Sequence, residues 1–221
     1  MPLAPWYNDG MERQVTSTAR RRRAKAGEPV WELARLFPPQ GAWSEEAYLA
    51  LDTGRLVEYS DGFLRVLPMP TRAHQLIVGY LYRLLFTFIQ AHYPGGEVLF
   101  APVPMRLSTR EYREPDVLFR FAERVEQDAG AYPHAADMVF EVVSGSPSDR
   151  ARDLVEKRHD YAQAGIPEYW IVDPDEGAIT VLWLEGEAYI EHGRFAGDET
   201  ATSRLLPGFA VAVAGVWAAA Q

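Results

Sequence analysis

Short stretches of alternating apolar and polar residues recur along the chain, and this period of two is typical of half-buried β-strands. Residues 55–60 and 63–67 alternate on either side of Asp61-Gly62, a dipeptide that favours the positive φ of a tight turn. They predict an N-terminal β-hairpin. Other stretches rich in Val, Leu, Phe and Ile predict further strands, at residues 97–107, 115–120, 138–143 and 168–173, and at 178–184 with 187–192 as a C-terminal hairpin.

Helical spacing of apolar residues and the signals at helix ends predict the helices between these strands. Thr71 can cap a long helix whose apolar residues recur on one broad face. Ser148 precedes a polar helix over residues 149–164, which stops at Gly165, and Ser44 begins a short helix that ends near residue 52. The alternation of hairpin, helix, strands, helix and strands predicts an α/β fold with a mixed sheet flanked by helices.

The length of 221 residues suits one domain with a substantial core and additional tails. Residues 1–30 contain Arg20 to Arg23 and Lys25 but little apolar periodicity, so they predict a flexible basic extension before a single domain over residues 31–221. The extension is interpreted first as a solvated tail, or as the product of an early start codon with Met11 as another candidate. A nucleic-acid-contacting arm is the alternative.

The chain has no cysteine, which excludes disulfides, thiolate zinc sites and a cysteine nucleophile. Any metal must then be held by oxygen or imidazole ligands, which favours Mg²⁺ or Mn²⁺. No apolar run approaches the roughly 20 residues that span a bilayer, so a soluble, cytoplasmic protein is expected. The net charge of −9 counts against nucleic-acid binding, and DNA affinity is expected to be weak without metal.

Two acidic residues interrupt apolar strands: Asp116 at the start of one and Glu141 near the end of another. A buried carboxylate is unfavourable unless it pairs with a cation or binds a metal, so the two acids predict a shared divalent ion. In the helix that follows, Asp153, Lys157 and Tyr161 recur at every fourth position and therefore share one face. Oxygen ligands beside a lysine form the set that metal-assisted phosphodiester hydrolysis needs.

Roughly residues 40–190 resemble the Uma-two family of restriction endonucleases, within the PD-(D/E)XK nuclease superfamily. The resemblance is carried by Pro115-Asp116, by Glu141-Val142-Val143-Ser144, by Glu58-Tyr59-Ser60-Asp61-Gly62, and above all by the segment from Asp153 through Lys157, Tyr161 and Gly165 to Pro174. It implies a restriction-endonuclease-like mixed sheet, and a helix that often begins near His74.

The resemblance also implies a role for each matching residue. Asp116 and Glu141 would be metal ligands, with the carbonyl of Val142 or Val143 as a third, and Lys157 would be the catalytic cation. The superfamily usually places its lysine two residues after the acid, where this chain has Val143, so the next helix would supply Lys157 instead. Glu58 would be an accessory carboxylate near the metal.

Each of these residues also has a structural interpretation. Asp116 could start a strand or a turn, Glu141 could form a buried structural ion pair, and Lys157 could be a solvated helix residue. The remaining alternatives are an exposed Glu58 or one paired with Arg55, a capping or packing His74, Asp153 paired with Lys157 rather than with metal, and core packing for Tyr161, Tyr169 and Trp170. Arg106, Arg110 and Arg113 precede Asp116 and could contact phosphates, but a solvated loop is the first interpretation.

The leading functional hypothesis is Mg²⁺-dependent hydrolysis of double-stranded DNA by a homodimer that cuts the two strands. A second hypothesis is a non-catalytic module that keeps the nuclease fold and binds nucleic acid or a protein. A third is a metal-dependent phosphohydrolase that acts on RNA or nucleotides.

Overall fold

The computed structural model describes residues 37–128, 130–143 and 150–221. The fold lies in residues 39–221. The basic extension expected over residues 1–30 and the expected helix start at Ser148 lie outside the described residues.

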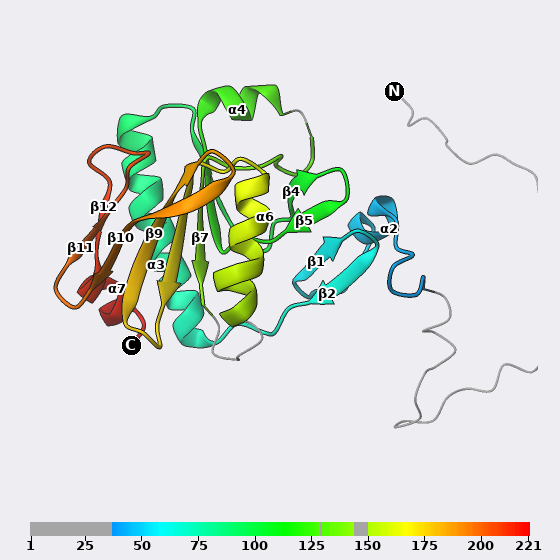
Figure 1. The fold of residues 1–221 in the computed structure, drawn as a ribbon, viewed down its shortest axis with the longest axis horizontal. Coiled ribbons are helices and arrows are strands. Elements are labelled where there is room, and N and C mark those ends of the chain that lie inside the picture. The colour runs from blue at the N-terminus through cyan, green and yellow to red at the C-terminus, as the bar shows by residue number, and fades with distance from the viewer. Residues whose placement is uncertain (1–36, 129, 144–149) are drawn as a thin grey trace, which may run out of the picture. The chain divides into compact units, whose positions relative to one another are not determined.

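A six-stranded mixed sheet forms the centre of the fold, in the order β10-β9-β8-β7-β6-β3 (Figure 1). Only β7 and β8 pair in parallel among its described strands. A four-stranded sheet has the order β2-β1-β5-β4, and β11 pairs with β12. The strands are β1 (Val57–Ser60), β2 (Phe63–Val66), β3 (Glu97–Phe100), β4 (Met105–Ser108), β5 (Glu111–Arg113), β6 (Val117–Arg120), β7 (Met138–Val142), β8 (Glu168–Asp173), β9 (Ala178–Glu185), β10 (Ala188–Ala196), β11 (Thr200–Thr202) and β12 (Ala210–Ala212).

Helices cover both faces of the six-stranded sheet, with α3 behind it and α6 in front of it in the view of Figure 1. Thr71 caps α3 as expected, because its hydroxyl accepts a hydrogen bond from the amide of His74 at 3.1 Å. Ser44 likewise caps α2. The helices are α2 (Glu45–Leu49), α3 (Arg72–His92), α4 (Ala122–Gln127), the π-helical turn η1 (Arg152–Glu156), α6 (Lys157–Gln163) and α7 (Val213–Ala219).

The alternation of side chains along the strands separates two cores. Val117 and Phe119 of β6 join the cluster that contains the buried face of α3, whereas Leu118 joins the cluster that contains Tyr161 of α6. In β7, Phe140 and Val142 belong to the α3 side, and Val139 belongs to the α6 side. Because Glu141 lies between Phe140 and Val142, this alternation places its side chain on the face of the sheet that packs against α6.

Both predicted hairpins and the mixed α/β fold are confirmed, but the single strand expected over residues 97–107 is wrong. The segment splits into β3 of the large sheet and β4 of the small one. Pro102 and Pro104 lie between them, and because proline has no backbone N–H it interrupts a ladder of strand hydrogen bonds. The short elements β5 and α4 were not expected.

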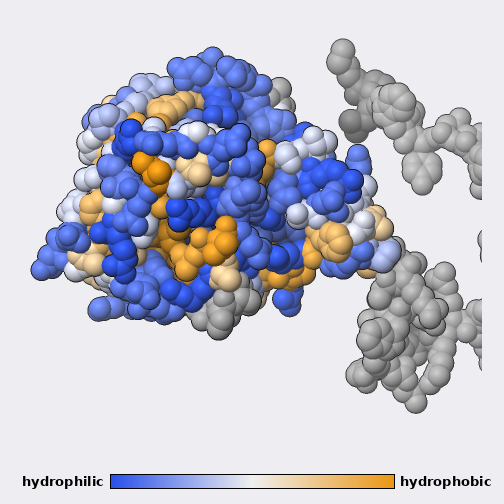
Figure 2. Space-filling view, viewed as in Figure 1, coloured by the Kyte–Doolittle hydropathy of each residue, from blue (hydrophilic) through white to orange (hydrophobic). Residues whose placement is uncertain are grey.

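The visible face in Figure 2 is mostly hydrophilic, with hydrophobic side chains gathered over α6 and near the β1–β2 hairpin. Val155 of η1 is 66% exposed and Val66 of β2 is 57% exposed. Within residues 37–128, 130–143 and 150–221, no helix combines the length and apolar character needed to cross a membrane.

Candidate active site

Asp116 and Glu141 lie side by side on neighbouring strands. Val117 of β6 pairs with Phe140 of β7 in antiparallel register, so one step back along β6 and one step on along β7 bring Asp116 opposite Glu141. The Asp116 carboxylate accepts a hydrogen bond from the backbone amide of Val142 at 2.7 Å, which fixes it against the end of β7. Both side chains are nearly inaccessible to solvent.

Lys157 completes this group from the first position of α6. Its Nζ lies 2.7 Å from Oε2 of Glu141, 3.4 Å from Oδ1 of Asp153 and 3.6 Å from Oε1 of Glu58. Only 2% of Lys157 is exposed, so the solvated helix residue is excluded. The structure therefore brings together the three side chains of Asp116, Glu141 and Lys157.

The helix that supplies Lys157 contains a π-helical turn, η1, directly before α6, and such turns often occur at functional sites. Asp153 lies in this turn, pairs with Lys157 as the spacing predicted, and has its carbonyl bonded to the hydroxyl of Tyr169 at 2.8 Å. Tyr161 packs in the core as expected. Its hydroxyl also donates a hydrogen bond to Oε1 of Glu141, a contact that spacing alone did not reveal.

Glu58 reaches the same group from β1. It is fully buried, so an exposed hairpin residue is excluded, and its charged neighbours are Lys157 and Arg113 rather than Arg55. Its two carboxylate oxygens make no hydrogen bond with the described residues. Glu58 also lines a cavity of about 660 Å³, together with Arg65 and Arg113.

The solvated loop expected for three arginines is wrong for Arg113. This residue is 7% exposed and binds Asp160 of α6 through two nitrogens, at 2.7 and 3.1 Å. Burial by itself would lower its pKa, but Glu58, Glu111 and Asp160 outweigh burial and raise it. Arg106 pairs with Glu45 and Arg110 with Asp61.

Two further residues of the site were missed or underestimated from the sequence. Glu114 lines the same cavity as Asp116, and its Oε2 is buried without a hydrogen-bond partner among the described residues. Burial raises the pKa of Glu114 to about 7. His74 does more than cap and pack, because its Nε2 lies 3.3 Å from Oδ2 of Asp116. The Glu-Pro-Asp sequence at 114–116 was the available signal for Glu114.

A small cavity of about 30 Å³ lies at the centre of this group, enough for one water or one ion. Four acids and two cations are among the residues that line it, namely Glu114, Asp116, Glu141, Asp153, Arg152 and Lys157.

The protonation of the Lys157–Glu141 pair follows from this enclosure. Burial alone would lower the pKa of Lys157, but the charges of Glu141, Glu58 and Asp153 outweigh it and raise the pKa, so the side chain stays an ammonium. Burial raises the pKa of Glu141, with Lys157 opposing the shift and Asp116 adding to it. Lys157 is therefore suited to stabilise negative charge and unsuited to act as a base.

The donor chemistry at this cavity fits a hard divalent cation, because its acidic oxygens are the ligands that Mg²⁺ and Mn²⁺ prefer. Glu114 also lines this cavity, and its buried Oε2, which has no hydrogen-bond partner among the described residues, is a further oxygen ligand that the site offers. No three acidic or histidine side chains in the described ranges form a ready-made metal cluster. Glu141 is engaged by Lys157 and Tyr161, so a metal would have to share this carboxylate with them.

A family model described as "Uma2: Putative restriction endonuclease" matches residues 45–214, which include Glu58, Asp116, Glu141 and Lys157. The chain belongs to the Uma2 family. The predicted family is thus confirmed, and the Uma2 match covers both hairpins and the helices between them.

A solved structure similar to this Uma2 chain is that of a putative nuclease belonging to DUF820 from Anabaena variabilis ATCC 29413. The TM-score is 0.64 at 15% identity, and the match covers 83% of this chain and 100% of that chain. At this identity the likeness concerns the fold, and it confirms the nuclease-type α/β architecture. No curated protein matches the chain.

Proposed function

We propose that this Uma2-family chain is a metal-dependent endonuclease that hydrolyses phosphodiester bonds of DNA. The observation that carries the proposal is the convergence of Asp116, Glu141 and Lys157 around one small buried cavity, from two strands and a helix. A structural ion pair would need only Glu141 and Lys157. It would leave unexplained why Asp116, Glu114 and Asp153 gather beside them despite their mutual repulsion.

The metal ligands in this proposal are Asp116, Glu141 and the carbonyl of Val142, which would hold Mg²⁺ or Mn²⁺. A bound ion would act as a Lewis acid and lower the pKa of attacking water. Lys157 remains protonated and stabilises the charge that develops on the scissile phosphate. Glu58 helps to keep that ammonium charged and oriented, which makes it a positioning residue in this scheme.

The test is nicking of supercoiled plasmid in Mg²⁺, followed by comparison of wild type with Asp116→Asn and Glu141→Gln. Both variants keep the side-chain volume but remove a charge, and we expect the nicking rate to fall by at least about 100-fold. Asp198→Asn, at an exposed position, is the matched control and should nick like wild type. Equal nicking by all four proteins, each folded by circular dichroism, would reject the assigned site.

A non-catalytic binding module is the second candidate, and one observation favours it. Lys157 already neutralises Glu141 at 2.7 Å, and no three-residue metal cluster exists among the described side chains. Calorimetric titration with Mn²⁺ separates the two functions, because the nuclease requires binding that Asp116→Asn abolishes. If titration of the wild-type protein with Mn²⁺ gives no heat of binding, the non-catalytic binding module is favoured.

Cleavage of both strands of a duplex would require two copies of the site, and a homodimer is the proposed arrangement. Sedimentation of the protein with and without DNA measures this directly. If the protein sediments as a monomer and only nicks DNA, the proposed activity is limited to single-strand cuts.

A further inference from the structure

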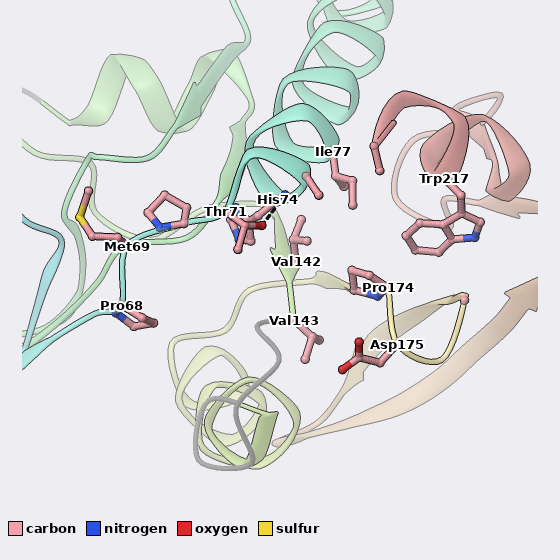
Figure 3. Close-up of a pocket in the computed structure, with 14 residues that line it drawn as sticks. Pro68, Met69, Thr71, His74, Ile77, Val142, Val143, Pro174, Asp175 and Trp217 are labelled. Carbon is pink, nitrogen blue, oxygen red and sulfur yellow. Dashed lines mark hydrogen bonds between the residues drawn. The ribbon is translucent and has the colours of Figure 1, made fainter.

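A large cavity of about 750 Å³ opens next to the small acidic one (Figure 3). Its size falls within the range of small-molecule and cofactor pockets. In Figure 3, Trp217 and Pro174 lie across the opening from Met69 and Pro68, with Val142 between the two sides.

The two cavities adjoin and share part of their lining. Pro68, Pro70, His74 and Val142 line both of them. His74 stands at the junction, with Nε2 facing Asp116 at 3.3 Å and with Nδ1 buried and without a hydrogen-bond partner among the described residues. A group in the large cavity would therefore lie next to whatever occupies the acidic one.

The chemistry of the large cavity differs from that of its neighbour. Proline rings, an indole, Met69 and aliphatic side chains provide most of its lining, and these surfaces suit a flat aromatic ring. Asp175 is the single acid among the described lining residues, and it lies 3.3 Å from Arg150, a cation that it shares with Asp173. In a chain of net charge −9, this wall repels a polyanion less than most of the surface would.

We propose that the large cavity receives an unstacked nucleobase from the strand whose phosphate lies at Asp116 and Glu141. This inference rests on the proposed function. A nucleobase is one sugar removed from its phosphate, so a strand bound at the acidic cavity has a base within reach of the junction at His74.

The inference narrows the substrate class. A base inside a double helix is stacked and paired, and removing it from the stack costs a few kcal/mol. A single strand, or a duplex opened at the cut, does not carry this penalty. The preferred substrate is therefore DNA with unpaired bases at the cleaved position.

The experiment uses a short single strand with 2-aminopurine at its centre and the same strand in a duplex, bound to wild-type protein with Ca²⁺ in place of Mg²⁺. We expect tighter binding of the single strand and a change in 2-aminopurine fluorescence as the base leaves its neighbours and enters the cavity. Met69→Asp places a charge on the cavity rim at a position that is 70% exposed, and should weaken single-strand binding about tenfold. Ile190→Asp, 42% exposed on β10, adds the same charge outside the lining and should bind like wild type.

Three results would overturn the assignment: equal or tighter binding of the duplex, unchanged fluorescence, or equal effects of the two substitutions. Plasmid nicking distinguishes this failure from that of the proposed function. If wild type nicks plasmid but the fluorescence is unchanged, the proposed nuclease function is supported and the binding of a base in the large cavity is rejected. If no plasmid is cleaved but Met69→Asp weakens single-strand binding and Ile190→Asp does not, the binding of a base in the large cavity is supported and the nuclease function is rejected.

Discussion

Glu141 is held by buried donors at both of its oxygens, with Lys157 on Oε2 and the Tyr161 hydroxyl on Oε1. Tyr161→Phe removes only the second donor. Because a buried oxygen then lacks a partner, we expect the free energy of unfolding to fall by about 1–2 kcal/mol in urea titrations. Glu141 would also lose its fixed orientation, so the nicking rate should fall about tenfold or more.

Tyr189→Phe is the matched control for that substitution. Its hydroxyl is also buried and donates to the carbonyl of Ile166 at 2.6 Å, away from the acidic cavity. Both variants should lose similar stability, but only Tyr161→Phe should lose nicking. An equal effect on nicking would show that Tyr161 acts only through stability.

Asp128 links pH to stability. Burial would raise its pKa, but hydrogen bonds from the amides of His134 and Gly130 and the charge of Arg120 outweigh burial and lower it. A carboxyl whose pKa is lower in the folded state stabilises the protein above its unfolded pKa of about 3.9. That contribution is lost as pH falls through the folded pKa.

Asp128→Asn should therefore flatten the decline of unfolding free energy below about pH 4. It should also lower stability by about 2 kcal/mol at neutral pH, where Arg120 loses the nearer of its two carboxylate partners, at 2.6 Å, and keeps Glu97. Urea titrations from neutral to acidic pH measure both effects. Asp198→Asn, at an exposed position, should keep the wild-type profile. Parallel profiles for Asp128→Asn and wild type would contradict the prediction.

At the scale of elements, Glu168 ties the C-terminal segment to the central sheet. This fully buried residue at the start of β8 accepts hydrogen bonds of 2.7–2.8 Å from the Trp170 indole, the Ser203 hydroxyl and the amides of Arg204 and Leu205. The loop between β11 and β12 is thereby attached to a strand more than thirty residues away.

Glu168→Ala would leave those donors buried and unpaired, so we expect a loss of roughly 3 kcal/mol or more in urea unfolding. Faster amide exchange in β11 and β12 should accompany it, because their attachment is lost. Glu187→Ala, at an exposed position in the β9–β10 turn, should change neither quantity. Unaltered exchange in Glu168→Ala would show that other contacts hold the segment.

Elements with strong local signals could be predicted from the sequence. The Thr71 cap with its apolar face predicted α3, and Asp61-Gly62 predicted the first hairpin. The element β5 has three residues and exists through pairing with β1 and β4, partners that no local pattern reveals. The π-helical turn could not be predicted either, because the four-residue spacing of Asp153 and Lys157 does not distinguish a π-helix from an α-helix.

The same reasoning explains which site residues were found. Buried acids in apolar strands are unfavourable unless they pair with a cation or bind a metal, so Asp116 and Glu141 could be recognised as candidate site residues. Tyr161 matched a core pattern, and nothing in that pattern distinguishes a hydroxyl bonded to Glu141 from one bonded to backbone. The four-residue spacing placed Lys157 on one helix face with Asp153 and Tyr161, whereas the family likeness supplied its catalytic role and supplied Glu58.

At the scale of the whole molecule, the candidate site depends on both main sheets. The chain passes from β5 in the four-stranded sheet through Glu114, Pro115 and Asp116 directly into β6 of the six-stranded sheet. The four-stranded sheet also contacts α6 twice, through Glu58 beside Lys157 and through Arg113 bonded to Asp160.

A shortened version of the protein that began after the first hairpin would keep Asp116 and Glu141 but would lose Glu58 and the strand that pairs with β5. Arg113 would be left at a free edge, and one of the acids that hold the Lys157 ammonium would be gone. Trimming the chain to a minimal catalytic core is therefore ruled out at this end. Useful reductions in length must come from elsewhere in the molecule.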